Sequence, residues 1–292
     1  MEEIMLIEEK HPDKKAEQLF ERLIGIEKQK SDLVNCLGVM FNKEIIIKWQ
    51  KDHHSKGLKF LSDILSEMPL IILSGEVGCG KSALAHSVGT PVAKGLGKRL
   101  TTFETPSDVR GSGRVGELSA RITSVFAQVK AKIIGEEYGI LIIDEADDLA
   151  TSRSQNQAHH EDRAGLNVLV KQIDAINRDK KNLVVILITN RVSVLDAAII
   201  RRASLHLIFK RPDVKERRGV FQYLFDGIDL KKTDLAKLVE ASATNTVPFS
   251  YSDLIDKIGK QAVLKAIQFN KPFCPAIYLE ILKETEPSPS VD

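Results

Sequence analysis

The sequence is poor in cysteine and lacks long apolar runs. Its 292 residues contain three cysteines, Cys36, Cys79 and Cys274, which are far apart and show no paired metal-ligand spacing. Such cysteines suit a reducing cytosol better than a disulfide framework. No apolar run approaches the roughly 20 residues of a transmembrane helix, and the acidic Met-Glu-Glu-Ile start has no secretory-signal pattern. We therefore expect a cytoplasmic protein without a membrane partner.

The sequence also lacks a strong excess of charge of either sign. Its 42 Lys and Arg residues nearly balance 40 Asp and Glu residues, so the formal net charge is only +2. This charge provides no bulk attraction to nucleic acid or to an anionic membrane, although a local basic patch stays compatible with nucleic acid. The length allows one large domain and a small one, and 43% hydrophobic with 28% charged residues is typical of globular proteins.

The most informative stretch runs from Leu70 to Ser82. Its apolar start predicts a buried strand, and the glycine spacing that follows matches the Walker A phosphate-binding loop. The glycines let backbone N–H groups face a phosphate chain, Lys81 would reach the β- and γ-phosphates, and Ser82 would give one oxygen to Mg²⁺. The helix that follows would point its positive N-terminal end at the phosphates and so strengthen their binding. A chance glycine-rich turn is the alternative, but strand, loop and helix signals follow in the required order. The residues expected to bind nucleotide here are Gly75, Val77, Gly78, Cys79, Gly80, Lys81, Ser82 and Ala83.

A second buried strand, residues 139–143, ends in two carboxylates, Asp144 and Glu145. A continuous apolar run is typical of a central parallel strand, and α/β sheets bind ligands at the carboxyl ends of their strands. This is a Walker B pattern, in which Asp144 would bind the Mg²⁺ shell and Glu145 would activate the attacking water as general base. An Asp-Glu pair alone is equally typical of a helix cap, and the Walker A loop upstream favours the catalytic interpretation.

Two weaker signals follow. Asn190 ends the apolar strand 183–188 and would hold the attacking water against the γ-phosphate, although asparagine commonly ends strands. Arg201 and Arg202 carry guanidinium groups that suit the charge spread over a transferring phosphoryl group. An arginine pair near a strand is also common at a protein surface.

Strands alternate with helices as far as Pro212, and only helices are expected beyond it. This order predicts an α/β fold, a three-layer αβα domain of the P-loop NTPase kind with a small helical lid domain. The predicted parts are a polar lead (1–13), the large nucleotide-binding domain (14–211), the helical lid (212–285) and a disordered tail (286–292).

In this order and spacing, the motifs resemble those of an AAA+ ATPase over residues 17–270. The resemblance implies ATP and Mg²⁺ as ligands, ATP hydrolysis as the activity, and adenine packed against Ile24, Gly25 and Ile26. The segments that carry it beyond the Walker motifs are similar to the extended Walker B, the arginine-finger segment and the opening of the lid helix: Asp144–Leu149 with Arg153, Leu195–Arg202 and Phe249–Leu254.

Within AAA+ proteins the chain resembles the pachytene-checkpoint type, which remodels HORMA-domain proteins. The segments that carry this resemblance are Asp144–Arg153, Asn167–Asp174 and Ile200–Ala203. The short N-terminal part, in which no separate substrate-recognition domain is expected, is similar to that of the bacterial members. Those accompany a HORMA protein and a cyclic-nucleotide synthase in anti-phage (CBASS) operons. The resemblance implies a homo-hexamer that remodels a HORMA protein and acts indirectly on the synthase.

The loop over residues 107–116 holds three glycines and two arginines, which predicts a mobile basic loop. The resemblance places it in the ring's pore, with Arg110, Arg114 and Val115 towards substrate, although the pore position is usually aromatic. A second departure is Ser252, where the pachytene-checkpoint type has a lid arginine. Two alternatives stay open: a DNA-associated AAA+ ATPase, such as a loader or transposition regulator, and a nucleotide-gated scaffold. An intact Glu145 argues against the scaffold.

Overall fold

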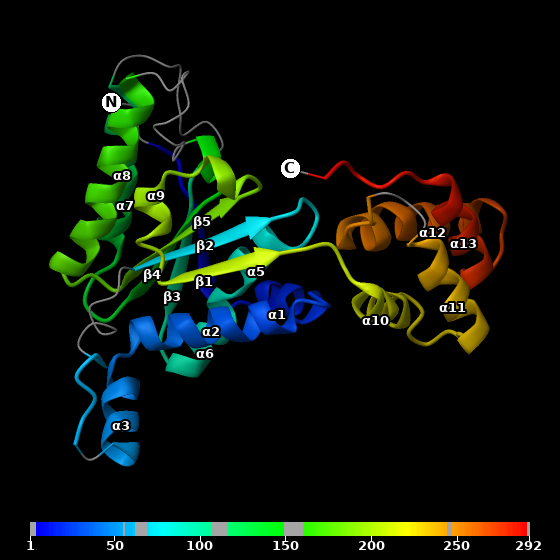
Figure 1. Ribbon diagram of the computed structural model, residues 1–292, viewed down its shortest axis with the longest axis horizontal. Coiled ribbons are helices and arrows are strands. Elements are labelled where there is room, and N and C mark those ends of the chain that lie inside the picture. The colour runs from blue at the N-terminus through cyan, green and yellow to red at the C-terminus, as the bar shows by residue number, and fades with distance from the viewer. Residues whose placement is uncertain are drawn as a thin grey trace. The chain divides into compact units, whose positions relative to one another are not determined.

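The structure is a computed structural model that describes residues 4–54, 56–61, 69–106, 116–148, 160–243 and 247–290 (Figure 1). It contains two compact units. We call the first the sheet unit; it comprises Met1–Glu21, Lys28–Ser74 and Ser82–Ile208. We call the second the lid unit; it comprises Arg22–Glu27, Gly75–Lys81 and Phe209–Asp292. The lid unit therefore includes the Walker A loop and the segment expected to contact adenine, in addition to the helices after Pro212.

A six-stranded sheet forms the centre of the sheet unit, in the order β1-β3-β4-β5-β2-β6. The strand β1 pairs antiparallel with β3, whereas β3, β4, β5 and β2 pair in parallel. The carboxyl ends of these four strands thus meet at one edge, which confirms the predicted α/β fold. The strands are β1 (Ile7–His11), β2 (Leu70–Gly75), β3 (Leu100–Glu104), β4 (Tyr138–Ile143), β5 (Leu183–Thr189) and β6 (Leu205–Phe209).

Helices cover both faces of the sheet, with α7 and α8 on one side and α2, α5 and α6 on the other (Figure 1). Alternate residues of β2, β4 and β5 enter the core beneath α7 and α8, as the period of two in a strand requires. Both faces are covered there, so the central strands β2, β4 and β5 contain the unbroken apolar runs 70–73, 140–143 and 183–188. The helices of this unit are α1 (Lys14–Arg22), α2 (Glu27–Phe41), α3 (Glu44–His53), α5 (Lys81–Ser87), α6 (Gly89–Leu96), α7 (Glu117–Lys132), α8 (His160–Arg178) and α9 (Ala197–Ile200).

The expected polar lead contains the edge strand β1, which the sequence did not predict. Four of its five side chains are exposed, and only the last, His11, is buried. The imidazole of His11 is hydrogen-bonded to Thr90 Oγ1 at 2.9 Å and to Thr102 Oγ1 at 3.1 Å. A buried histidine with two hydroxyl partners therefore anchors this edge of the sheet.

His11 should make the stability of the fold depend on pH. Burial lowers its pKa from the ordinary value of 6.5, although the charges of Glu9 and Asp13 oppose the shift. The unfolded chain therefore takes up a proton that the folded chain resists, and the free energy of unfolding falls as the pH drops below about 6.5. We expect the urea midpoint to fall between pH 7.5 and pH 5.5 by more in the wild type than in His11→Gln. Equal falls in both proteins would show that His11 is not the group responsible.

The described residues of the lid unit form four α-helices, and a π-helical turn over Asp253–Ile258 leads into the third of them. Its core contains Phe221, Phe225 and Tyr278, whose rings meet edge to face. The expected disordered tail differs from the structure, because Ser288 Oγ donates to Asp253 Oδ1 at 2.5 Å. No helix in the described ranges has both the length and the apolar character needed to cross a membrane. The helices are α10 (Val214–Leu224), α11 (Lys232–Ala241), α12 (Gly259–Gln268) and α13 (Pro275–Glu284).

Candidate nucleotide-binding site

In the sheet unit, the predicted metal-binding pair is already in contact. Ser82, on the first turn of α5, donates a hydrogen bond from Oγ to Asp144 Oδ2 at 2.6 Å. Asp144 directly follows β4, which lies between β3 and β5 and is fully buried over its last five residues. A hydroxyl and a carboxylate of this kind are hard oxygen ligands, which Mg²⁺ prefers.

Glu145 follows with an exposed side chain and an unusual backbone. Its φ is +51°, in the left-handed region that non-glycine residues rarely enter. Its N–H donates to Asp144 Oδ1 at 2.7 Å. Such strain costs about 1–3 kcal/mol and clusters at functional sites. The sharp turn therefore sets two carboxylates side by side at the carboxyl edge of the sheet.

The neighbouring strand contributes polar groups to the same edge. Leu187 of β5 pairs with Ile143 of β4, so the ends of the two strands are adjacent. Thr189, the last residue of β5, donates from Oγ1 to Asp147 Oδ1 at 2.9 Å. Asn190 follows and is half-buried. The structure thus brings Asn190 to the edge that holds the Walker B carboxylates, as the strand order requires.

Glu104 at the end of β3 was not predicted as a site residue. It lies beside His86 of α5, with Nε2 and Oε1 3.5 Å apart. Burial raises the pKa of Glu104, the nearby charge of Asp144 raises it further, and His86 opposes both. Only the pairing of β3 with β4 brings this third carboxylate near Asp144, and a glutamate at a strand end carries no such signal in the sequence.

The two predicted arginines have different surroundings. Arg202 is half-buried and donates from Nε to Asp174 Oδ1 of α8 at 3.1 Å and from Nη1 to the carbonyl oxygen of Ala198 at 3.0 Å. Arg201 is exposed; its backbone N–H donates to the carbonyl oxygen of Ala197 at 3.0 Å, and its side chain forms no hydrogen bond or ion pair with a described residue. Within one chain, therefore, Arg202 is held by its own subunit while Arg201 faces outwards.

In the lid unit, the Walker A loop curls around its lysine. Lys81 is only 5% exposed, and Nζ donates to the carbonyl oxygens of Gly75 at 2.8 Å and Glu76 at 2.7 Å. Gly78 has φ +71°, and a Cβ there would lie 2.7 Å from Ser250 Oγ. Only glycine therefore fits at this bend. Elsewhere in the loop, Cys79 is buried and Val77 is exposed. Burial raises the pKa of the Cys79 thiol to about 11.

The segment expected to contact adenine lies against this loop, within the same unit. Ile26 is buried, and its Cδ1 lies 3.4 Å from the place where a Cβ on Gly80 would be. Ile24 and Gly25 precede it and are half-buried. Residues about 55 positions apart in the chain are thereby gathered beside the phosphate-binding loop. Lys81, the last residue of this loop in the lid unit, directly precedes Ser82 in the sequence.

The predicted magnesium site fits a partly hydrated ion. No group of three or more His, Cys, Asp or Glu side chains able to hold a metal occurs among the residues that the structure describes. Mg²⁺ commonly takes one or two protein oxygens and completes its shell with water and substrate phosphates. Ser82 and Asp144 are sufficient for that role. The predicted pore-loop residues Arg110, Arg114 and Val115, and Arg153, lie outside the described residues.

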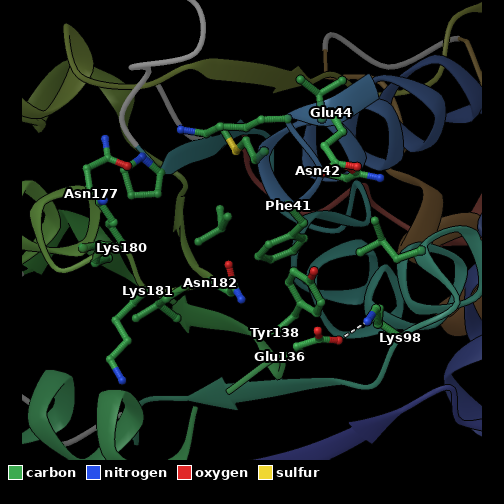
Figure 2. Close-up of a pocket in the computed structure, with 18 of the residues that line it drawn as sticks. Phe41, Asn42, Glu44, Lys98, Glu136, Tyr138, Asn177, Lys180, Lys181 and Asn182 are labelled. Carbon is green, nitrogen blue, oxygen red and sulfur yellow. Dashed lines mark hydrogen bonds and ion pairs between the residues drawn. The ribbon is translucent and has the colours of Figure 1, made fainter. Parts of the chain in front are cut away.

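A separate cavity of about 630 Å³ lies at the opposite edge of the sheet, where β4 and β5 begin. Figure 2 shows Tyr138 beside Phe41 in this cavity and Lys98 paired with Glu136. None of the residues predicted to bind nucleotide lines it. Because α/β sheets place ligands at the carboxyl ends of their strands, this cavity is not the nucleotide site.

Comparisons of sequence and of structure show which known proteins this chain is similar to. The family model described as "ATPase family associated with various cellular activities (AAA)" matches residues 71–211. CD-NTase-associated protein 6 from Escherichia coli strain MS 115-1 is 32% identical over 290 residues, which cover 96% of this chain and 93% of the relative.

Two solved structures are also similar to this chain. A chain in the structure of the E. coli MS115-1 HORMA:CdnC:Trip13 complex aligns with a TM-score of 0.92 and 30% identity, covering 99% of this chain and 98% of that one. The structure of Rhizobiales Trip13 aligns with a TM-score of 0.77 and 27% identity over 97% of this chain and 98% of that one. Both similarities extend over the whole length of each chain.

Proposed function

The chain belongs to the AAA ATPase family, in the group of the CD-NTase-associated protein 6 relatives, and we propose that it uses ATP hydrolysis to remodel a HORMA-domain protein in the bacterial cytoplasm. One observation carries the proposal: the whole-length similarity to a chain of the HORMA:CdnC:Trip13 complex. The remodelled protein would in turn control a cyclic-nucleotide synthase, and the system would act against phage. The active form would be a homo-hexamer.

The catalytic roles follow from the chemistry of the residues in the two Walker motifs and at the end of β5. The buried ammonium of Lys81 and the N–H groups of residues 75–83 bind the phosphates of ATP. Ser82 and Asp144 would hold Mg²⁺, which would neutralise charge on the phosphates of ATP. Glu145 accepts a proton from the attacking water as general base, and Asn190 orients that water.

An arginine of the pair Arg201 and Arg202 would complete the site of a neighbouring subunit. We expect the double variant Arg201→Ala/Arg202→Ala to lose ATPase activity, since an arginine finger is worth roughly 10³–10⁵ in rate in GTPases. Mixing it with Lys81→Ala subunits should restore part of the activity, because each variant supplies what the other lacks. Arg178→Ala, at the far end of α8, is the control and should hydrolyse ATP normally. Assembled mixtures that stay inactive at every ratio would show that the arginines do not act in trans.

The experiment that tests the function uses the basic loop. Arg114→Ala changes no residue to which a catalytic role is assigned, so basal ATP hydrolysis should stay near normal while stimulation of the ATPase by the HORMA protein falls. A salt titration of DNA binding is run in parallel. A DNA partner would instead show weaker binding by the variant and a salt slope reduced by about one unit for each lost phosphate contact. Wild-type stimulation by the HORMA protein in Arg114→Ala would remove this loop from the substrate path.

A further inference from the structure

Tyr251, at the start of the lid's third helical segment, reaches the segment expected to contact adenine. Its hydroxyl donates a hydrogen bond to the carbonyl oxygen of Gly25, 3.1 Å away, and the residue is only 7% exposed. The ring lies flush against Gly25: a Cβ there would be 2.4 Å from the Tyr251 hydroxyl oxygen, and Gly25 has φ +78°. Both the left-handed backbone at this position and the closeness of the phenol therefore favour glycine at residue 25.

Ser252, the residue after Tyr251, is hydrogen-bonded to the Walker A loop. The N–H of Ser252 donates to the carbonyl oxygen of Gly78 at 3.0 Å. Tyr251 and Ser252 thus connect two segments of the lid unit that lie far apart in the sequence, one beside the base and one around the phosphates. In the sequence both residues lie within the segment Phe249–Leu254, which resembles the opening of the lid helix, but neither was predicted to bind nucleotide.

The turn that presents Tyr251 is itself firmly held. The carboxylate of Asp253 accepts hydrogen bonds from the N–H of Ser250 at 2.9 Å and from Ser288 Oγ at 2.5 Å. Burial raises the pKa of Tyr251, and the charge of the neighbouring Glu216 carboxylate and a hydrogen bond to it raise the pKa further, so the phenol keeps its proton. A fixed donor can preorganise the backbone that it holds.

We infer that Tyr251 is a positioning residue for nucleotide recognition: its hydroxyl fixes the Gly25 carbonyl, so that residues 24–26 are shaped to receive the adenine before ATP arrives. The inference rests on the proposed function, which assigns Ile24, Gly25 and Ile26 to the base. It concerns affinity for the base, because neither the hydroxyl of Tyr251 nor Gly25 is placed at the reacting phosphate.

The chain offers a matched pair of variants for the test. Tyr251→Phe removes one hydroxyl and keeps the ring that fills the space beside Gly25. Tyr278→Phe removes an equivalent buried hydroxyl in the same unit, which donates to the carbonyl oxygen of Leu254 at 2.7 Å. Losing one buried hydrogen bond should cost each protein a similar part of its unfolding free energy. Only Tyr251, however, holds the base segment.

The measurements are the Kd for Mg·ATP, the KM and kcat for ATP, and the Kd for Mg·tripolyphosphate, which lacks a base. For Tyr251→Phe we expect Kd and KM for ATP to rise about three- to tenfold, with kcat changing much less and tripolyphosphate binding as in the wild type. Tyr278→Phe should match the wild type in all of these. Both urea midpoints should fall by similar amounts.

Three outcomes overturn the inference. Unchanged ATP affinity in Tyr251→Phe would show that the hydroxyl does not shape the site. If Tyr251→Phe weakened the binding of ATP and of tripolyphosphate equally, the effect would lie at the phosphate-binding loop. If Tyr251→Phe and Tyr278→Phe weakened ATP binding equally, the effect would follow from the loss of stability. Failure of the part of the proposed function on which the inference rests, adenine binding by residues 24–26, would look different, since the wild-type protein itself would then not bind ATP more tightly than tripolyphosphate.

Discussion

Glu145→Gln should bind ATP with near wild-type affinity and release phosphate at least about 10²-fold more slowly, because a positioned general base typically contributes 10²–10⁴ in rate. The amide keeps the size of the carboxylate beside Asp144 but cannot accept the proton of the attacking water. The pair Ser82 and Asp144, joined at 2.6 Å, is left intact, so nucleotide and metal binding should persist. Phosphate release and equilibrium ATP binding are measured side by side.

The matched control for this variant is Glu240→Gln, an equivalent change of an exposed glutamate on α11. It should hydrolyse ATP like the wild type. Normal turnover by Glu145→Gln would contradict the assignment of the base and would direct attention to the other carboxylate near Asp144, Glu104 at the end of β3.

Lys81→Ala should lose nucleotide affinity rather than turnover alone. The ammonium is buried inside the Walker A loop, and removing one partner of a buried charged interaction typically costs about 2–5 kcal/mol. At about 1.4 kcal/mol for each factor of ten, we expect the Kd for Mg·ATP to rise roughly 30-fold or more. Lys237→Ala, on the exposed side of α11, is the control. Unchanged ATP affinity in Lys81→Ala, with the fold intact, would refute the role of this lysine.

The sheet and the Walker motifs were predictable because their signals are local. Apolar runs bounded by glycine or by carboxylates mark β2 and β4, and the glycine spacing of the Walker A loop marks a backbone shape that few sequences can form. The edge strand β1 was not predictable, because four of its five side chains are exposed, and three of these four are charged. Its existence depends on pairing with β3, about 90 residues later in the chain.

The missed site residues share this dependence on distant contacts. Glu104 is near Asp144 only because β3 pairs with β4, and Tyr251 matters only because the lid's helix begins against Gly25. Contacts between residues far apart in the sequence also explain why the boundary between the two units differs from the predicted one. A prediction made along the chain assigns the Walker A loop to the large domain, whereas its glycines pack on Ser250 and on the backbone of Phe209, within the lid unit. Long-range packing of this kind leaves no periodic trace in the sequence.

The central claim is that ATP hydrolysis by this chain changes the conformation of a HORMA-domain protein. The most direct measurement is limited proteolysis of the purified HORMA protein after incubation with the wild-type ATPase and Mg·ATP, with Glu145→Gln as the matched inactive enzyme. The account predicts a changed cleavage pattern, and release of any bound cyclic-nucleotide synthase, only with the wild-type enzyme and hydrolysable ATP. An unchanged pattern under active hydrolysis, or the same change with Glu145→Gln, would contradict it.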